Sequence, residues 1–378
     1  MNMRFFVLPL VCALSAVGIA GCSADESSPT SEDDITEKPP QFVIFAFDGS
    51  YNNAFWQESR DFAKSVKKGD GSAALKFTYF VNPSYYTPDA NKTKYCPPQG
   101  SSCGKSAIGF GGTVDEIKVR ITQTAAAHAE GHAIESHAVG HWDGSTWSVD
   151  QWTKEFDQFG PLFFNNPDGT PRTELNPIKE AGIVGFRAPQ LGNDPALYTV
   201  LKAKGFTYDT SKVAQTNYWP EKINGVWNFP LASLVLKNSG KRTLSMDYNH
   251  YVAHSKGVAD AANAAKYEKD VLDTYNAYFE KNLAGNRAPL HIGHHFSKWN
   301  GGAYWEAMKA FAKTVCTRPD VKCGTYRDLV SYMESLPANK RAKLQAGNFE
   351  DSADVCPANE PACQGEPLGA HDDEGATK

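Results

Sequence analysis

The sequence has no surplus of basic residues. Its 38 Lys and Arg residues are outnumbered by 43 Asp and Glu residues, which gives a formal net charge of −5. A protein that binds DNA or RNA needs a basic surface for the phosphate backbone, so we expect no nucleic-acid partner. Disorder of the whole chain is also excluded, because 41% of the 378 residues are hydrophobic and 12% are aromatic, enough to bury a substantial core.

Common nucleotide-binding and nucleophile motifs are also missing. The segment CGKS at 103–106 has Gln99 where a phosphate-binding P-loop requires glycine, and GFGGTV at 109–114 does not have the glycine spacing of a dinucleotide site. No G-x-S-x-G nucleophile elbow occurs. We therefore expect neither a nucleotide ligand nor a serine nucleophile of the α/β-hydrolase kind.

The apolar run near the N-terminus is too short to cross a bilayer. Residues 1–21 have the pattern of an export signal, with Arg4 followed by an apolar run and small residues. IAGC at 19–22 resembles the lipobox of bacterial lipoproteins, in which cleavage leaves Cys22 acylated and anchored to a lipid bilayer. Ser23 resembles the outer-membrane sorting signal. The expected location is the bacterial cell envelope, at the periplasmic side or the surface of the outer membrane; the alternative is ordinary cleavage and release.

Two segments contain too few large apolar residues to fold. Residues 22–40 are polar, acidic and proline-containing, which predicts a flexible tether. Residues 345–378 are acidic and predict a mostly disordered tail. The folded domain is expected between them, at 41–340.

The cysteines that follow Cys22 form three pairs with the same short spacing. In an exported protein this pattern favours three local disulfide loops, each worth about 2 kcal/mol by loop-closure entropy. Zinc knuckles use closer spacing, so a structural metal is the weaker interpretation. The expected disulfides are Cys96–Cys103, Cys316–Cys323 and Cys356–Cys363.

Strand and helix patterns alternate along the domain. QFVIFAFD at 41–48 is a continuous apolar run, typical of a strand buried on both faces. Strands separated by helices predict a parallel sheet, and about seven such units favour a barrel over a doubly wound sheet. Further strands are expected at 75–82, 183–189, 206–209, 233–237, 243–247 and 288–295, and helices at 55–66, 115–129, 195–204, 258–283, 304–315 and 325–336.

Polar side chains follow these strands, where a parallel barrel gathers its reactive groups. His137 and His141 are four residues apart, so on a helical turn both imidazoles would share one face and could bind one divalent cation. A structural role for the pair is the alternative. The other candidates are Asp48, which is also a common turn former, Arg187, which could be an ordinary ion-pair partner, and Asp209, Asp247, His294 and His295, of which the two histidines cannot both face inward on a regular strand.

These motifs, in this order, resemble the polysaccharide deacetylases of carbohydrate esterase family 4, the NodB-homology domain, and within it the chitin-deacetylase-like branch. The resemblance covers residues 41–336. It implies an α/β fold, a distorted (β/α)7-8 barrel of the NodB-homology type. In the family the first strand ends in Thr-Phe-Asp-Asp, a general base followed by a metal ligand. Alignment on Phe47 makes Asp48 the base and Gly49 the missing ligand; a shift by one makes Asp48 the ligand and removes the base.

The remaining motifs carry the other implied roles. His137 and His141 match the metal-binding histidines. RAPQ at 187–190 resembles the third motif, in which Arg187 orients the base and the backbone N–H of Gln190 helps to bind the oxyanion. The last motif selects His295 as the general acid, with His294 in reserve; Asp209 or Asp247 would orient it.

The resemblance implies a metal-dependent hydrolase that removes N-acetyl groups from amino sugars of an envelope glycan, peptidoglycan or a chitin-like oligosaccharide. The cation would be Zn²⁺, with Co²⁺ as the second choice, held by Asp48, His137 and His141 or completed by Asp143. Trp142 and Trp299 are candidate platforms for sugar rings, with packing as the alternative. Because Gly49 removes one carboxylate, the rival hypothesis is a catalytically impaired, glycan-binding lipoprotein.

Overall fold

A computed structural model describes residues 39–346. The predictions for the export signal, for acylation of Cys22, for the acidic tail and for the Cys356–Cys363 disulfide lie outside the described residues. No helix of residues 39–346 is both long and apolar enough to cross a membrane.

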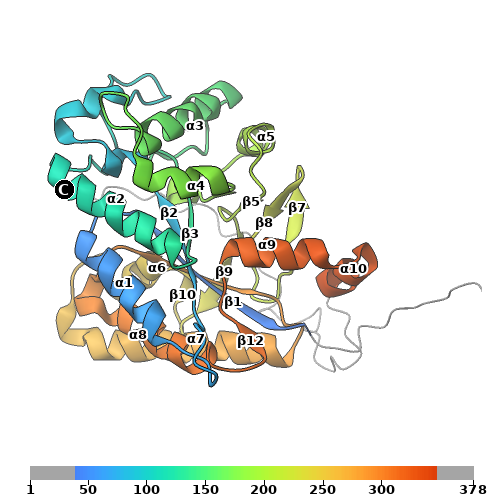
Figure 1. Ribbon diagram of the computed structural model, residues 1–378. Helices are drawn as coiled ribbons and strands as arrows, with labels where there is room; N and C mark the ends of the chain where they lie inside the picture. Colours follow the sequence, from blue (N-terminus) through green and yellow to red (C-terminus); the bar gives the residue numbers. More distant parts are fainter. Residues whose placement is uncertain (1–38, 347–378) are drawn as a thin grey trace, which may run out of the picture. The chain divides into compact units, whose positions relative to one another are not determined.

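The secondary structure alternates between strands and helices (Figure 1). The strands are β1 (Gln41–Asp48), β2 (Phe77–Val81), β3 (Ala133–Ser136), β4 (Gly185–Phe186), β5 (Tyr208–Asp209), β6 (Val213–Ala214), β7 (Glu221–Ile223), β8 (Val226–Asn228), β9 (Leu231–Val235), β10 (Arg242–Leu244), β11 (Leu290–His295) and β12 (Val321–Lys322). The α-helices are α1 (Asn53–Ser65), α2 (Val114–Ala129), α3 (Val149–Phe164), α4 (Asn176–Ala181), α5 (Pro195–Ala203), α6 (Asp247–Ser255), α7 (Ala264–Ala284), α8 (Trp299–Val315), α9 (Tyr326–Ser335) and α10 (Ala338–Ala346). Short 3-10 helices are η1 (Pro83–Tyr86), η2 (Asp89–Lys94), η3 (Thr173–Leu175), η4 (Pro189–Leu191) and η5 (Ala261–Asn263).

The main sheet of the described residues has nine strands in the order β11-β1-β2-β3-β4-β5-β8-β7, with β12 paired to β1. All pairings are parallel except β7 with β8. The sheet curls into an incomplete barrel of the predicted α/β class. Strands β10, β9 and β6 form a second sheet, although Met246 in the predicted segment 243–247 forms a parallel bridge with Gly293 on β11 of the main sheet.

Strand β1 runs through the centre of the core. All eight of its residues are buried, and it ends at Asp48, just before Gly49, whose φ of +79° favours glycine. The Phe47 ring lies 5.0 Å from Phe77 and 5.9 Å from Trp305, measured between ring centroids. Aromatic pairs of this kind anchor the helices on the outside of the sheet.

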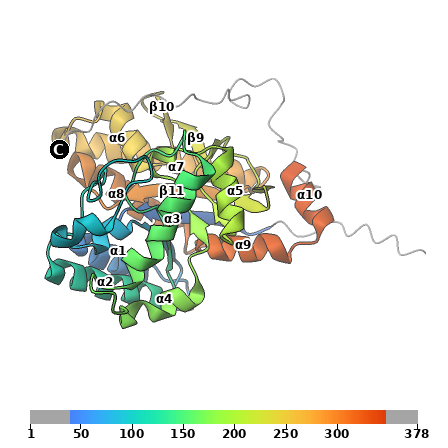
Figure 2. The same cartoon turned by 90° about the horizontal axis from the view of Figure 1, so that it is seen from above.

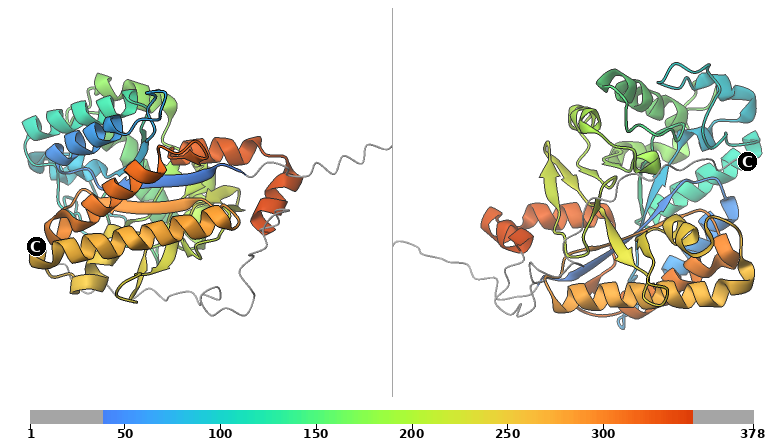
Figure 3. Two further views of the ribbon diagram at one scale, coloured as in Figure 1. Left: turned by 90° about the horizontal axis from the view of Figure 1, so that it is seen from below. Right: turned by 180° about the vertical axis from the view of Figure 1, so that it is seen from behind.

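The helices pack in pairs around the sheet. Helices α7 and α8 lie side by side (Figure 3), as do α3 and α5 (Figure 2). Helix α2 begins with a capping box, in which Thr113 and Glu116 each bind the other's backbone N–H. Helix α3 was not expected, although Ser148 and Gln151 form the same motif at its start.

The parallel register brings the carboxyl ends of the central strands to one edge. Asp48, the last residue of β1, is the register partner of His295 on β11 and of Phe80 on β2. Ser136, at the end of β3, pairs with Phe186 on β4. The residues that follow these strands therefore meet at one mouth of the incomplete barrel, as parallel topology predicts.

Two of the three predicted disulfides lie within residues 39–346, and both are present. Cys96 bonds Cys103 and Cys316 bonds Cys323.

Candidate functional site

Asp48 is a buried carboxylate held by a buried guanidinium. Its side chain is 4% exposed, and Arg187 Nη1 donates to Asp48 Oδ1 over 2.7 Å. Burial opposes ionisation, but the charge of Arg187 lowers the pKa of Asp48 below its ordinary value. Asp48 is therefore ionised at neutral pH and is oriented by a charge-assisted hydrogen bond.

Arg187 is fixed by contacts that leave it little freedom. Its Nε donates to Thr210 Oγ1 over 2.7 Å, and its Nη2 donates to Tyr326 Oη over 3.2 Å. The guanidinium carbon lies 4.7 Å from the centroid of the Phe80 ring. Thr210 and Tyr326 were not predicted as site residues, and Tyr326 lies on α9, far from Arg187 in the sequence.

His295 forms a second oriented pair with Asp247. His295 Nδ1 donates to Asp247 Oδ1 over 2.7 Å, and the His295 backbone N–H donates to Asp247 Oδ2 over 2.8 Å. Burial opposes protonation of the imidazole, but the adjacent carboxylate raises the pKa of His295 above its ordinary value. Burial raises the pKa of Asp247, but the neighbouring His295 and His294 lower it by more. The pKa of Asp247 therefore lies well below its usual range.

The two consecutive histidines of β11 have different surroundings. The His295 side chain is 28% exposed, whereas that of His294 is 2% exposed. His294 packs 5.9 Å from the Phe47 ring, and its Nε2 has no hydrogen-bond partner in the structure. Both imidazoles approach Asp247, since His294 Nδ1 lies 3.6 Å from Oδ2 and His295 Nδ1 lies 2.7 Å from Oδ1, so the expectation that only one of them faces inward stays a prediction.

His137 and His141 face each other across an irregular loop. Their ring centroids are 4.9 Å apart. The predicted helical turn is wrong: the backbone is non-helical, and Ala138 and His141 have φ values of 55° and 59°. The left-handed conformation at these two positions, next to Gly140, turns the chain tightly enough to bring the rings together.

The environment keeps both imidazoles neutral. His137 Nδ1 lies 2.7 Å from the carbonyl oxygen of Arg187, so Nδ1 carries the proton and Nε2 is left as an acceptor. Burial lowers the pKa of His137, and burial together with His137 lowers the pKa of His141 to about 3. A neutral ring with one nitrogen fixed by a carbonyl is the form in which histidine binds a metal.

A buried glutamate that was not predicted shapes this loop. Glu155 Oε1 on α3 accepts the backbone N–H groups of Val139 and Gly140 over 2.8 and 2.9 Å. Its Oε2 accepts the hydroxyl of Tyr95 over 2.8 Å. A Cβ atom at Gly140 would lie 2.3 Å from the Tyr95 hydroxyl oxygen, so only glycine allows this approach. Glu155 thus fixes the backbone between the two imidazoles.

Two of the three donors that catalytic zinc usually takes from protein are in place. His137 and His141 have suitable chemistry, and Asp48 lies near both but is paired with Arg187. Within residues 39–346 no group of three or more His, Cys, Asp and Glu side chains is arranged to hold a metal ion. The residues present therefore fit a cation only in part, and Gly49 stands where the resemblance expects the additional carboxylate.

The remaining predicted polar residues are Gln190, Asp209 and Asp143. Gln190 lies in η4 with a φ of 55°, two residues beyond the buried Ala188 and close in sequence to Arg187. Asp209 accepts from Tyr198 and Ser211, not from a site histidine, so of the two candidate aspartates only Asp247 contacts His295. The exposed Asp143 binds the backbone N–H of Ser145 over 2.9 Å and adds no third metal donor.

The two predicted sugar platforms are both partly buried. Trp299 stacks on Tyr251 with centroids 5.4 Å apart and contacts His295 edge to face at 5.2 Å. Trp142 packs against both hydrophobic clusters of the core. Packing therefore accounts for much of each ring, and their contact with sugar stays a prediction.

No protein-family model matches the sequence, and no curated protein is significantly similar to it. Solved structures do resemble it. A Mycobacterium smegmatis protein assigned as a polysaccharide deacetylase has a TM-score of 0.46 and 13% identity, over 79% of this chain and 91% of that chain. A family 4 acetyl xylan esterase from Clostridium thermocellum, complexed with cobalt, has a TM-score of 0.39 and 14% identity, over 83% of this chain and 100% of that chain. A mutant of a CE4 family pseudoenzyme with restored enzymatic activity has a TM-score of 0.40 and 9% identity, over 78% of this chain and 69% of that chain. At these values the likenesses carry no part of the functional argument.

Proposed function

We propose that this protein is a carbohydrate N-deacetylase of the NodB-homology type, acting on N-acetylated amino sugars of an envelope glycan. One observation carries the proposal: Asp48 and His295 lie at the ends of adjacent strands, and each is paired with a residue of opposite charge. Arg187 favours the ionised form of Asp48, and Asp247 favours the protonated form of His295. Asp48 and His295 are register partners, so their Cα atoms lie about 5 Å apart. The pKa of Asp48 is lowered and that of His295 is raised. A pair of groups with pKa values shifted apart in this way is the usual sign of an acid and a base with separate roles.

The chemistry assigned to these residues is hydrolysis of the acetamide. Asp48 accepts a proton from water as the water oxygen bonds to the acetyl carbon. Arg187 keeps Asp48 ionised and oriented, and the backbone N–H of Gln190 stabilises the oxyanion. His295 then donates its proton to the amine nitrogen as the C–N bond breaks, which yields acetate and the free amino sugar.

The proposal includes a divalent cation, zinc first and cobalt second, held by His137 and His141. Such an ion polarises a carbonyl and lowers the pKa of bound water. The steps assigned above use only side chains and backbone groups of this chain.

The test is release of acetate from peptidoglycan and from chito-oligosaccharides, with and without added zinc or cobalt. We expect Asp48→Asn and His295→Gln to abolish turnover. His291→Gln is the matched control, because His291 is a buried histidine of the same strand with no hydrogen-bond partner for either ring nitrogen. Failure of the unaltered protein to release acetate from either glycan under any metal condition would refute the proposal.

Gly49 and the two-donor imidazole pair favour a second candidate, a glycan-binding lipoprotein that has lost catalysis. This candidate predicts saccharide binding without added metal and equal binding by Asp48→Asn. It also predicts no acetate release by the unaltered chain, so the same assay separates the two.

For the location we propose lipid anchoring through Cys22 in the bacterial envelope. The support is the sequence IAGC followed by serine. Metabolic labelling with a radioactive or clickable fatty acid should label the expressed chain and fail to label Cys22→Ala. Equal labelling of both would exclude acylation at this position.

A further inference from the structure

An aromatic groove with a volume of about 470 Å³ lies next to the residues that follow strand β1. Its lining includes the rings of Tyr51, Tyr85 and Phe110. Tyr51 follows Asp48 by three residues, and a Cβ atom at Gly49 would lie 3.8 Å from Tyr85 Cε2. The groove therefore begins where strand β1 ends.

Three other lining residues, 108–110, follow a segment that binds the loop between the two imidazoles. Ala107 N–H donates to the carbonyl oxygen of Gly140 over 2.9 Å, and Ser106 Oγ donates to the same oxygen over 3.1 Å. The groove residues 108–110 follow directly in the chain. The groove is thus lined both by residues that follow strand β1 and by the segment attached to the imidazole loop.

Tyr51 presents an aromatic face to solvent. It is 46% exposed, more than any other Phe, Trp or Tyr side chain of residues 39–346. Arg120 covers one face of its ring, with the guanidinium carbon 4.9 Å from the centroid, and the Tyr85 ring lies 5.1 Å away. A large, half-exposed ring held in place by a guanidinium is suited to stacking against the apolar face of a sugar.

One buried arginine joins the three segments that line the groove. Arg120 is 1% exposed and donates to the carbonyl oxygens of Tyr51, Tyr85 and Gly111. A Cβ atom at Gly111 would lie 2.2 Å from the Tyr85 carbonyl oxygen, so this close approach requires glycine. The groove is therefore preorganised, which reduces the entropy that binding has to overcome.

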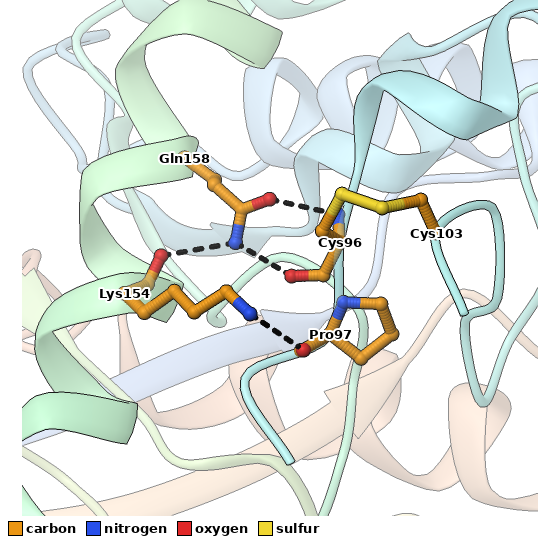
Figure 4. Close-up of a disulfide and its surroundings, with 5 residues drawn as sticks. All are labelled: Cys96, Pro97, Cys103, Lys154 and Gln158. Carbon is orange, nitrogen blue, oxygen red and sulfur yellow. Dashed lines mark hydrogen bonds between the residues drawn. A yellow bond between two sulfur atoms is a disulfide. The ribbon is translucent and has the colours of Figure 1, made fainter. Parts of the chain in front are cut away.

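The Cys96–Cys103 disulfide closes the long segment between η2 and the groove (Figure 4). The side chain of Gln158 on α3 accepts from the Cys96 backbone N–H over 2.8 Å and donates to the Cys96 carbonyl over 2.9 Å. Lys154 Nζ donates to the Pro97 carbonyl over 3.1 Å. These contacts attach the segment to α3 and keep its ends in place.

The polar groups of the groove define the kind of ligand. Asp89 and Lys92 are exposed and of opposite charge, and no carboxylate of residues 39–346 forms an ion pair with Lys92. Opposite charges leave little net attraction for an anion or a cation, but they supply hydrogen-bond acceptors and donors for hydroxyl groups. An aromatic face with such a rim is suited to a neutral pyranose ring.

We propose that this groove is a subsite for a neutral pyranose unit of the glycan, adjacent to the sugar whose acetamide faces Asp48 and His295. The inference rests on the proposed function for the position of the reacting sugar. The protein would then bind oligosaccharides in preference to monosaccharides, with Tyr51 as the principal stacking residue.

The test uses binding and turnover of N-acetylglucosamine and its β-1,4-linked tetramer. Tyr51→Ala should weaken binding of the tetramer about tenfold, a factor that corresponds to about 1.4 kcal/mol, and leave the monomer unchanged. Tyr51→Phe, which keeps the ring, should bind the tetramer like the unaltered chain. Val258→Ala is the surface control, because Val258 is 67% exposed and outside the groove.

Measuring both binding and turnover lets the subsite and the deacetylase proposal be refuted independently. If the unaltered chain binds the tetramer without releasing acetate, the deacetylase proposal fails, and a loss of tetramer binding in Tyr51→Ala still supports the subsite. If acetate is released and Tyr51→Ala has the same kcat/KM for the tetramer, the subsite is refuted while the deacetylase stands. Equal weakening for monomer and tetramer, or tetramer binding unchanged in Tyr51→Ala, would also overturn the subsite.

Discussion

Replacing Glu155 by alanine tests whether this buried carboxylate holds the loop between the two imidazoles. Glu155 is fully buried and accepts from Val139 N–H, Gly140 N–H and the Tyr95 hydroxyl. Its removal leaves three donors without their acceptor. At about 1 to 2 kcal/mol for each unsatisfied donor, we expect the free energy of unfolding to fall by about 3 to 6 kcal/mol.

The assay is urea denaturation combined with amide hydrogen exchange. Glu135→Ala is the matched control, because Glu135 is equally buried and accepts from the Val184 and Gly185 N–H groups over 2.9 and 2.8 Å. Both variants should be destabilised. In Glu155→Ala, the amides of Val139 and Gly140 should exchange faster than global unfolding explains. Unfolding free energy within about 0.5 kcal/mol of the original, or unchanged local exchange, would refute the reasoning.

The pH dependence of Glu155→Gln gives a second readout. Burial, only partly offset by its hydrogen bonds, raises the pKa of Glu155 above its ordinary 4.5. A raised pKa in the folded state means that the folded chain holds the proton more tightly than the unfolded chain does. The stability of the original protein relative to Glu155→Gln should therefore be highest below the unfolded pKa and fall as pH rises through the folded pKa. A constant difference would contradict the shift.

Three further predictions concern the charged groups of the site. Asp247→Asn removes the charge that raises the pKa of His295, so the alkaline limb of the kcat/KM profile should move to lower pH; an unmoved limb would exclude His295 as the acid. Arg187→Ala leaves Asp48 buried without its partner and should cost about 3 to 5 kcal/mol in urea denaturation, and a loss below about 1 kcal/mol would contradict the ion pair's role. Gly49→Asp should bind zinc at least tenfold more tightly than Gly49→Asn in equilibrium dialysis, because both variants bear the strain of φ +79° and only one adds a carboxylate; equal affinities would show that Gly49 does not replace a ligand.

The strands that form the core were readable from the sequence because burial on both faces imposes a continuous apolar run. QFVIFAFD forms β1 over the predicted residues, and LHIGHH within the predicted segment forms β11. The segments at 233–237 and 243–247 pair with each other in a second sheet, and Met246 forms a parallel bridge with Gly293 of the main sheet. Local hydrophobicity predicts that a segment forms a strand, but the choice of partner depends on packing that a single segment does not encode.

Features of the site that depend on residues close together in the sequence were predictable, and features that depend on tertiary contacts were not. The spacing of His137 and His141 suggested that their rings meet, but the reason given, a helical turn, was wrong because left-handed residues make the turn. The choice between Asp209 and Asp247 could not be made from sequence, since both follow strand-like segments and only tertiary packing brings one to His295. Glu155 had a detectable signal in the capping box that begins its helix, but nothing local connects it to the imidazole loop.

The two halves of the site depend on different parts of the chain. Strand register and two ion pairs hold Asp48 and His295, and these contacts come from β1, β11, α6 and the segment after β4. Glu155, together with the segment that carries Tyr95 and the Cys96–Cys103 disulfide, holds the imidazole loop, and that same segment continues into the aromatic groove. Because separate contacts hold the two halves, a change in the imidazole loop can leave the two ion pairs in place, which is why binding and turnover have to be measured separately.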